Sequence, residues 1–152
     1  MQDALKKDFT LRVTQANRSE LIVIIFDMCL SYLKEAIEDV DRAENIAKAR
    51  ACVDELKESL NFEYALSTDL LHLYIQVNKL LAQAAAGGRT EPLLEAQSIM
   101  IRLHDAFVKV SEADDSKPLV HNAQEVYAGY TYGKNDVNVN IEAGGTGRGF
   151  RV

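Results

Sequence analysis

The sequence predicts an all-α protein: an antiparallel up-down four-helix bundle with an N-terminal capping segment and a C-terminal tail rich in glycine and tyrosine. Apolar residues recur at spacings of three and four along four long segments, which places them on one face of a helix. The links between these segments are short, which favours antiparallel neighbours. A chain of 152 residues is also long enough for one domain with a sizeable core.

Charge and composition narrow the classes of function. The net charge is −6, whereas proteins that bind nucleic acid usually present a basic face. No apolar run approaches the ~20 residues that a membrane-spanning helix needs, and the N-terminus lacks the apolar stretch of a signal peptide. Cys29 and Cys52 lie beside apolar residues on helical patterns, so we interpret them as free buried thiols in a reducing compartment. We therefore expect a cytoplasmic protein with neither nucleic-acid binding nor membrane insertion.

Residues 1–16 form a lead-in whose apolar residues Phe9, Leu11 and Val13 alternate with other residues. Alternation at a spacing of two is typical of an extended segment. We therefore expect this segment to lie across a surface as an N-terminal cap.

The first predicted helix begins near Asn17 or Ser19, either of which can cap it, and runs to about Arg42. Its first turns hold six consecutive apolar residues, Leu21–Phe26. A helix completes a turn in about 3.6 residues, so this run places apolar surface around the whole helix. A bundle core covers only one side, and the other side needs a second cover from this chain or from a partner.

Three further helices are predicted at about 44–60, 64–86 and 90–113. Gly87–Gly88 ends the third helix, because glycine adopts the left-handed C-cap conformation easily. Pro92 falls in the first turn of the fourth, where its missing amide costs little. The core-facing residues predicted for these three helices are Ile46, Ala49, Val53, Leu56, Leu60, Leu66, Leu70, Leu73, Val77, Leu80, Ala84, Leu93, Ala96, Met100, Leu103, Phe107 and Val110.

The composition changes after the fourth helix, which divides the chain into a lead-in at 1–16, a helical bundle at 17–115 and a tail at 116–152. The tail holds six of the eight glycines and the tyrosines Tyr127, Tyr130 and Tyr132. Such a composition is typical of a flexible tail, or of a tail that docks its aromatic side chains on the bundle or on a partner.

The sequence offers little for catalysis. A carboxylate-bridged metal site in a helical bundle uses two Glu-x-x-His pairs and two further glutamates, and the nearest match is the single pair Asp69 and His72. The glycine-rich stretch 144–149 lacks the lysine and the strand-to-helix setting of a phosphate-binding loop. We therefore expect no enzyme activity, no catalytic residues, no metal site and no cofactor.

Apolar residues outside the core-facing rows form a candidate partner-binding surface. They lie in the opening run of the first helix and in a second row on the third helix, and contiguous surplus apolar surface of this kind marks partner sites. A groove between two bundle helices accepts an amphipathic helix. The pattern leaves open whether a partner occupies this surface or whether the N-terminal segment or a second copy covers it permanently. The candidate partner-binding residues are Ile22, Ile25, Phe26, Leu71, Tyr74, Asn78 and Leu81.

Several segments resemble, in their order and spacing, the motifs of the flagellin-specific export chaperones, the FliS family. They are Thr14–Leu21 with Ile25–Asp27, Ser59–Glu63, Leu70–Tyr74 with Asn78 and Leu81, and Leu103–Phe107. The sequence departs from the family pattern at Phe107, where the family often has tryptophan, and at Arg18, which replaces a frequent proline. Phe9 is our choice for the family's N-terminal aromatic residue.

The resemblance implies a helical bundle in the bacterial cytosol whose partner is the disordered C-terminal segment of flagellin. Binding would prevent premature polymerisation and aid flagellar type III export, and export gate components would be further partners. It also implies that Phe9, Leu11 and Val13 cap a groove until flagellin displaces them. We expect a monomer or weak dimer. The alternatives are a homo-oligomeric structural bundle and a carboxylate-metal helical-bundle enzyme.

Overall fold

The computed structural model describes residues 2–116, and within this range the chain forms five helices and no strand. The all-α prediction is therefore confirmed for the described residues. Almost all of the predicted tail, residues 117–152, lies outside them. One compact unit spans residues 18–115, and a second contains residues 1–17 and the chain after residue 115. The helices are α1 (Gln2–Gln15), α2 (Arg18–Ile37), α3 (Arg42–Glu58), α4 (Leu66–Gly87) and α5 (Glu91–Glu112).

The N-terminal segment is helical, so the prediction of an extended segment was wrong. Three alternating apolar residues are a short pattern, and no glycine or proline interrupts residues 2–15. The hydroxyl of Thr10 donates to the Lys6 carbonyl at 2.8 Å, one helical turn back. In a helix Phe9 and Val13 share a face, whereas Leu11 points away from them and is 57% exposed.

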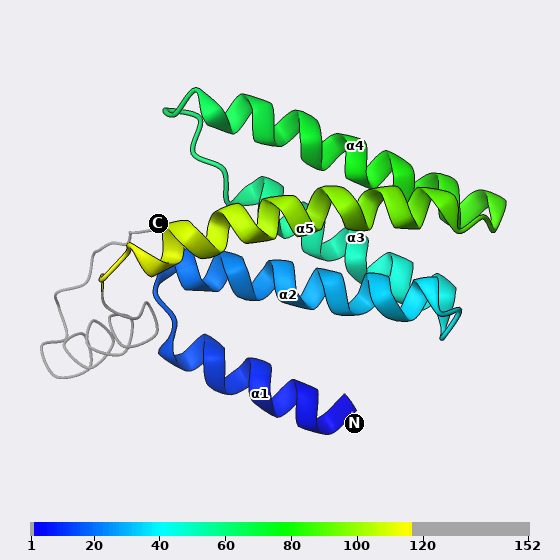
Figure 1. Cartoon of the computed structure of the whole chain (residues 1–152), viewed down its shortest axis with the longest axis horizontal. Coiled ribbons are helices and arrows are strands. Elements are labelled where there is room, and N and C mark those ends of the chain that lie inside the picture. The colour runs from blue at the N-terminus through cyan, green and yellow to red at the C-terminus, as the bar shows by residue number, and fades with distance from the viewer. Residues whose placement is uncertain (1, 117–152) are drawn as a thin grey trace, which may run out of the picture. The chain divides into compact units, whose positions relative to one another are not determined.

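The other four helices pack as a closed ring, and we call α2–α5 the helical bundle. α2 packs against α3 and α5, and α4 packs against the same two helices. In Figure 1 the colour advances from left to right along α2, returns along α3, and alternates again through α4 and α5. The hydroxyl of Ser19 donates to Asp114 Oδ2 at 2.6 Å, which joins the beginning of α2 to the residues that follow α5.

The core of the bundle is built mainly from the predicted core-facing rows. Its largest fully buried side chains are Tyr74, Phe26, Leu33, Ile46, Leu56, Leu81, Leu93, Met100, Val53 and Val77. Two predicted core residues lie outside it, because Leu66 is 63% exposed and Val110 is 53% exposed. Leu66 begins α4 and Val110 lies in the last turn of α5, so both continue a buried row beyond the point where the facing helices cover it.

The connections explain where two of the helices end. α2 stops at Ile37, earlier than predicted, and Asp39 and Asp41 then adopt positive φ values of 63° and 41°. Aspartate tolerates this left-handed region better than most residues. The Asn45 side chain donates to the Val40 carbonyl at 2.7 Å, which holds the turn against α3. At the end of α4, Gly88 has φ of 69° and its amide donates to the Ala84 carbonyl at 2.9 Å, as the sequence predicts.

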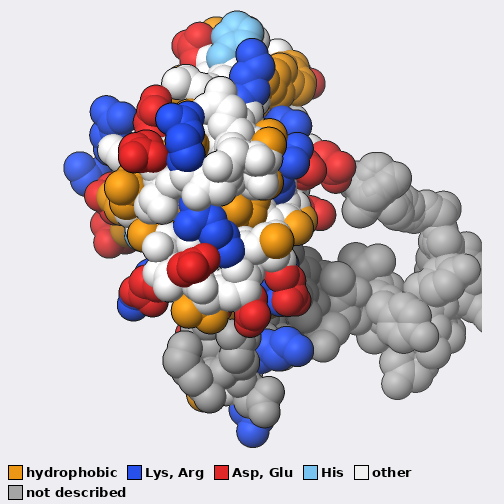
Figure 2. Space-filling view, turned by 90° about the vertical axis from the view of Figure 1, so that its right-hand side faces the viewer, with side chains coloured by type: hydrophobic (Ala, Val, Ile, Leu, Met, Phe, Trp, Pro, Cys, Tyr) orange, Lys and Arg blue, Asp and Glu red, His pale blue; other side chains and the backbone are white. Residues whose placement is uncertain are grey.

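The surface of the molecule mixes charges of both signs. Figure 2 shows basic and acidic side chains interspersed on one face, with hydrophobic side chains scattered among them rather than gathered into one patch. Among the described residues, no helix has the length and apolar character needed to cross a membrane.

Candidate functional site

The structure divides the seven predicted partner-binding residues into two groups. Phe26, Tyr74 and Leu81 are at most 1% exposed and belong to the core. They therefore present no side-chain surface to a partner in this state. The partly exposed residues are Ile22 and Ile25, which we call the α2 row, and Leu71 and Asn78, which we call the α4 row.

The α2 row lies along the seam between α2 and α3. Ile25 precedes Cys29 by four residues and Tyr32 by seven, so all three share one face of α2. Cys29 Sγ lies 3.7 Å from the Ala49 carbonyl of α3. The ammonium group of Lys48 on α3 lies over the Tyr32 ring, 5.7 Å from its centroid. The row thus presents apolar side chains that pack partly against the core and remain partly open.

The α4 row lies along the seam on the other side of α3. The Asn78 amide donates to Asp54 Oδ1 on α3 at 2.9 Å, and Lys57 lies 3.2 Å from the same carboxylate oxygen. The Asn78 carbonyl oxygen, Oδ1, is buried and accepts no hydrogen bond from the described residues. Leu71 precedes Asn78 by seven residues and so shares its face of α4.

α3 therefore separates the two rows, which the sequence pattern could not show. A partner that touches both rows has to cross the outer surface of α3 rather than lie in one groove between α2 and α4. The middle of α3 is charged at this surface, since Lys48, Asp54 and Glu55 are exposed.

An aromatic cluster in the bundle joins three helices, α2, α4 and α5. The Phe26 and Phe107 rings stack with centroids 5.3 Å apart, and the Phe26 and Tyr74 rings lie 6.4 Å apart at a tilt of 48°. Aromatic pairs in this range stabilise a core beyond the area they bury. Burial raises the pKa of the Tyr74 hydroxyl well above its ordinary value, because the phenolate would lose its hydration. Phe107 therefore contributes an aromatic contact between α5 and α2.

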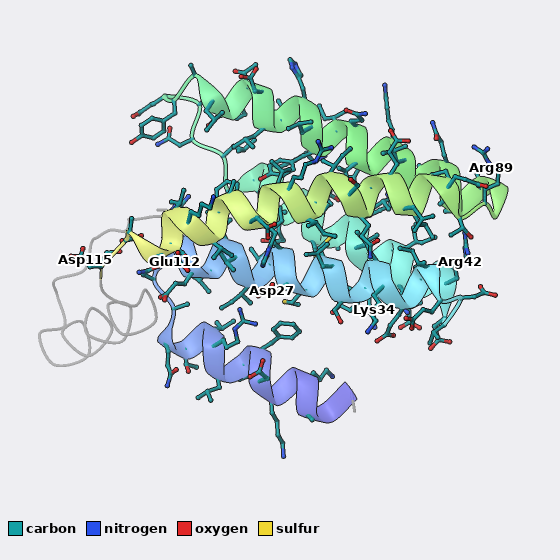
Figure 3. All side chains as sticks on the ribbon, in the orientation of Figure 1. Asp27, Lys34, Arg42, Arg89, Glu112 and Asp115 are labelled. Atoms are coloured by element: carbon teal, nitrogen blue, oxygen red, sulfur yellow. The ribbon has the colours of Figure 1, made fainter. Side chains whose placement is uncertain are left out.

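A polar contact between Asp27 and His104 links α2 to α5. Asp27 Oδ1 lies 2.8 Å from His104 Nε2, and His104 Nδ1 lies 3.1 Å from Asp105 Oδ1. Figure 3 labels Asp27 near the middle of α2. The sequence suggests that Asp27 is either an acceptor for a partner's amide or a solvated carboxylate, and the structure assigns it to a contact within the bundle. This pairing was not predictable from spacing, because the two residues are far apart in the chain.

The structure also exposes large hydrophobic side chains at the α3–α4 connection that the site prediction missed. Phe62, Tyr64 and Leu66 are 59%, 65% and 63% exposed. Leu66 fits the apolar spacing of the third predicted helix, so the periodicity placed it in the core. The signal for a turn before α4 is Asn61, a residue that favours turns. Its side-chain oxygen accepts a hydrogen bond from the Glu63 amide at 2.9 Å in an Asx-type turn.

The described residues contain no group of three or more histidine, cysteine, aspartate or glutamate side chains placed to hold a metal ion. Asp69 and His72 are both exposed on α4. The predicted cap residues Phe9, Leu11 and Val13 all lie on α1, in the other compact unit.

The chain is thus an all-α helical bundle by class over its described residues. Its sequence matches the family described as flagellar protein FliS over residues 1–114. The chain belongs to this family, whose members are flagellar secretion chaperones. It is also 27% identical, over 108 residues, to the flagellar secretion chaperone FliS of Bacillus subtilis (strain 168). That alignment covers 67% of this chain and 81% of the relative.

Proposed function

We propose that this protein is a cytosolic export chaperone that binds the disordered C-terminal segment of flagellin. It would keep flagellin from polymerising early and would aid its delivery to the flagellar type III export gate. α2–α5 would act as an antiparallel four-helix bundle, a reading that the alternating course of the chain and the ring of helix contacts support. Membership of the FliS family is the observation that carries the proposal.

The α2 and α4 rows are the proposed anchor sites. Ile22, Ile25 and Leu71 would supply apolar contact area to a helical or extended flagellin segment. The partly exposed Asn78 side chain would make a polar contact with the backbone of a stretch of the segment that is not helical. A segment that reaches both rows wraps across α3, and an unstructured chain does so more easily than a folded domain.

The three buried residues of the predicted site would act indirectly, through the packing of the residues at the surface. Phe26, Tyr74 and Leu81 belong to the core against which the α2 row packs, so they would shape the surface without touching the segment. We propose in addition that the N-terminal segment, with Phe9, Leu11 and Val13, covers apolar surface of α2 until flagellin displaces it. The run Leu21–Phe26 supports this proposal, because a helix that is apolar all round has to be covered on two sides.

The test measures binding of a flagellin C-terminal peptide by titration calorimetry. Ile25→Asp and Leu71→Asp each place a charge in a half-buried apolar contact, so we expect affinity to fall by about 30-fold or more, equivalent to ~2 kcal/mol. Leu94→Asp on α5 is the matched control, since Leu94 is 49% exposed and lies in neither row. Circular dichroism verifies that each variant is folded.

Other results would redirect the assignment. Equal affinity for wild type, Ile25→Asp and Leu71→Asp would remove the two rows from the flagellin site. Absence of binding by the wild type, together with a stable dimer at every concentration in gel filtration, would support the homo-oligomeric alternative. A deletion of residues 1–13 that speeds peptide association would support a displaceable lid. Lost solubility without faster association would indicate a permanent cover.

A further inference from the structure

The connection between α3 and α4 holds three large apolar side chains in solvent. Phe62, Tyr64 and Leu66 are 59%, 65% and 63% exposed, and they lie within five residues of one another. We call these three residues the apolar tip. Apolar surface that gathers in one place on a folded chain, rather than as single scattered residues, commonly marks a binding site.

The connection is ordered by its own hydrogen bonds, so the apolar tip is presented in a fixed form. The hydroxyl of the buried Ser67 donates to the Asn61 carbonyl at 2.6 Å, and the Tyr64 amide donates to the same carbonyl at 3.1 Å. The Glu63 amide donates to the Asn61 side-chain oxygen at 2.9 Å. A surface that is held in place before binding loses less conformational freedom when a ligand docks on it.

Acidic side chains surround the apolar tip in the sequence. Glu58, Glu63 and Asp69, which we call the acidic rim, are all exposed. None of these three carboxylates has an ion-pair partner among the described residues. Residues 58–69 also contain no lysine or arginine. The tip and its rim together therefore complement a segment that combines an aromatic side chain with positive charge.

The apolar tip lies at the end of the bundle where the chain continues into the tail. The Arg18 guanidinium, at the beginning of α2, donates to the Ser59 carbonyl at the end of α3 at 3.1 Å. The neighbouring Ser19 hydroxyl donates to Asp114, just after α5. Figure 1 shows the α3–α4 connection and the end of α5 at the same end of the bundle. The tail therefore begins at the end that carries the apolar tip.

One segment of the tail has the matching chemistry. Residues 148–152 contain Arg148, Phe150 and Arg151, and Phe150 is the only phenylalanine in the tail. The rest of the tail, residues 117–147, carries two lysines and three acidic residues, so the positive charge of the tail is concentrated in 148–152. An arginine side chain stacks on aromatic rings and pairs with carboxylates, and the apolar tip and the acidic rim offer both.

The segment is also within reach. Arg148 follows Ser116 by 32 residues, and a chain of this length can span up to ~100 Å. α4, with 22 residues, is only about 33 Å long. A covalent link between two binding groups can raise their local concentration to the millimolar range. A contact too weak to hold two separate molecules together can therefore form within one molecule.

We propose that residues 148–152 dock on the apolar tip of the same molecule. Phe150 packs on the aromatic rings of the tip, while Arg148 and Arg151 pair with carboxylates of the acidic rim. The proposal does not depend on the flagellin assignment, because every group in it belongs to this chain.

The first test records amide signals of the ¹⁵N-labelled full-length protein by NMR. In the double variant Arg148→Ser/Arg151→Ser we expect the signals of residues 61–66 to change. Salt at about 0.5 M should move the wild-type signals toward those of this variant, because it screens the attraction between charges. Lys117→Ser/Lys134→Ser is the matched control, since it removes the same charge from the rest of the tail and should leave these signals unchanged.

The second test changes the other side of the contact and measures cleavage by trypsin after Arg148. Phe62→Ser/Tyr64→Ser alters two exposed side chains, and circular dichroism verifies that the variant is folded. Cleavage tracks the undocked fraction, so with about half of the wild-type molecules docked the variant should be cut about twofold faster. Cleavage after Lys134 is the internal control and should proceed at the same rate in both proteins.

Three results would overturn the proposal. One is an identical set of tip signals in the wild type and the arginine double variant. Another is a set of wild-type tip signals that changes on dilution, which would place the segment on a second copy of the chain. The third is a response of the tip signals to serine at Tyr127, Tyr130 and Tyr132 instead of at the arginines, which would assign the tip to another part of the tail.

Discussion

Tyr74 is the largest fully buried side chain of the core, and its hydroxyl gives the bundle a pH dependence. Burial raises the pKa of the folded-state hydroxyl, while the unfolded value stays near ~10. A raised pKa means that the stabilisation is complete below the unfolded value and is lost as pH rises above it. Unfolding then releases a proton from Tyr74 at alkaline pH, and the free energy of unfolding declines.

Tyr74→Phe should remove this part of the alkaline decline. Above about pH 10 the slope of the unfolding free energy should become shallower by up to ~1.4 kcal/mol per pH unit. Urea titrations between neutral pH and alkaline pH measure it, with Tyr64→Phe as the control because Tyr64 is 65% exposed. Parallel slopes for wild type and Tyr74→Phe would mean that the hydroxyl is solvated.

At the scale of the helices, the two glycines that end α4 have different roles although they are adjacent. Gly88 has φ of 69°, a conformation that strains any residue with a Cβ, whereas Gly87 is the last residue of the helix. A Cβ at either position would meet no atom within 4 Å, so packing does not distinguish them. Backbone conformation alone sets the difference.

Gly88→Ala should therefore destabilise the protein by about 1 kcal/mol, the typical cost of left-handed backbone for a non-glycine residue. Gly87→Ala should be neutral or stabilising by ~0.5–1 kcal/mol, because alanine restricts the unfolded chain. Thermal melts of the two variants compare them directly. Equal changes in melting temperature would show that the C-cap is not formed in solution.

The helices themselves were largely predictable from sequence, because spacings of three and four over long segments report which face is buried. The ends of the helices were harder to predict. α2 stops shortly before Asp39 and Asp41, which adopt positive φ values, and the spacing of apolar residues does not encode that conformation. The extended prediction for residues 1–16 was wrong because three residues are too few to define a period. Periodicity also cannot say where a core ends, which is why Leu66 was expected to be buried.

The candidate site was predictable only in part, for a related reason. The pattern placed candidate residues on α2 and α4, and those of the α2 and α4 rows are partly exposed, whereas Phe26, Tyr74 and Leu81 are core residues. Helix periodicity gives the direction in which each side chain points from its helix. The packing of the helices against one another decides which of those directions is buried. The contacts of Asp27 with His104 and of Cys29 with the Ala49 carbonyl depend on the same packing.

On the scale of the whole molecule, the core cluster takes residues from all four helices of the bundle, so we expect it to unfold as one cooperative unit. Hydrogen exchange should show the slowest amides of α2, α3, α4 and α5 sharing one opening free energy, equal to that from denaturant unfolding. The first turn of α4, which begins with the exposed Leu66, should exchange sooner. Separate opening free energies for different helices of the bundle would contradict a single unit.

The hydrogen bond between Ser19 and Asp114 places the start of α2 beside the residues that follow α5. The first and last residues of the bundle therefore lie close to each other. Joining Asp115 to Arg18 by a short linker and opening the exposed Gly87–Gly88 turn would give a circular permutant with the same helix neighbours. A permutant that folds would show that the contacts between the helices, rather than their order along the chain, define the fold.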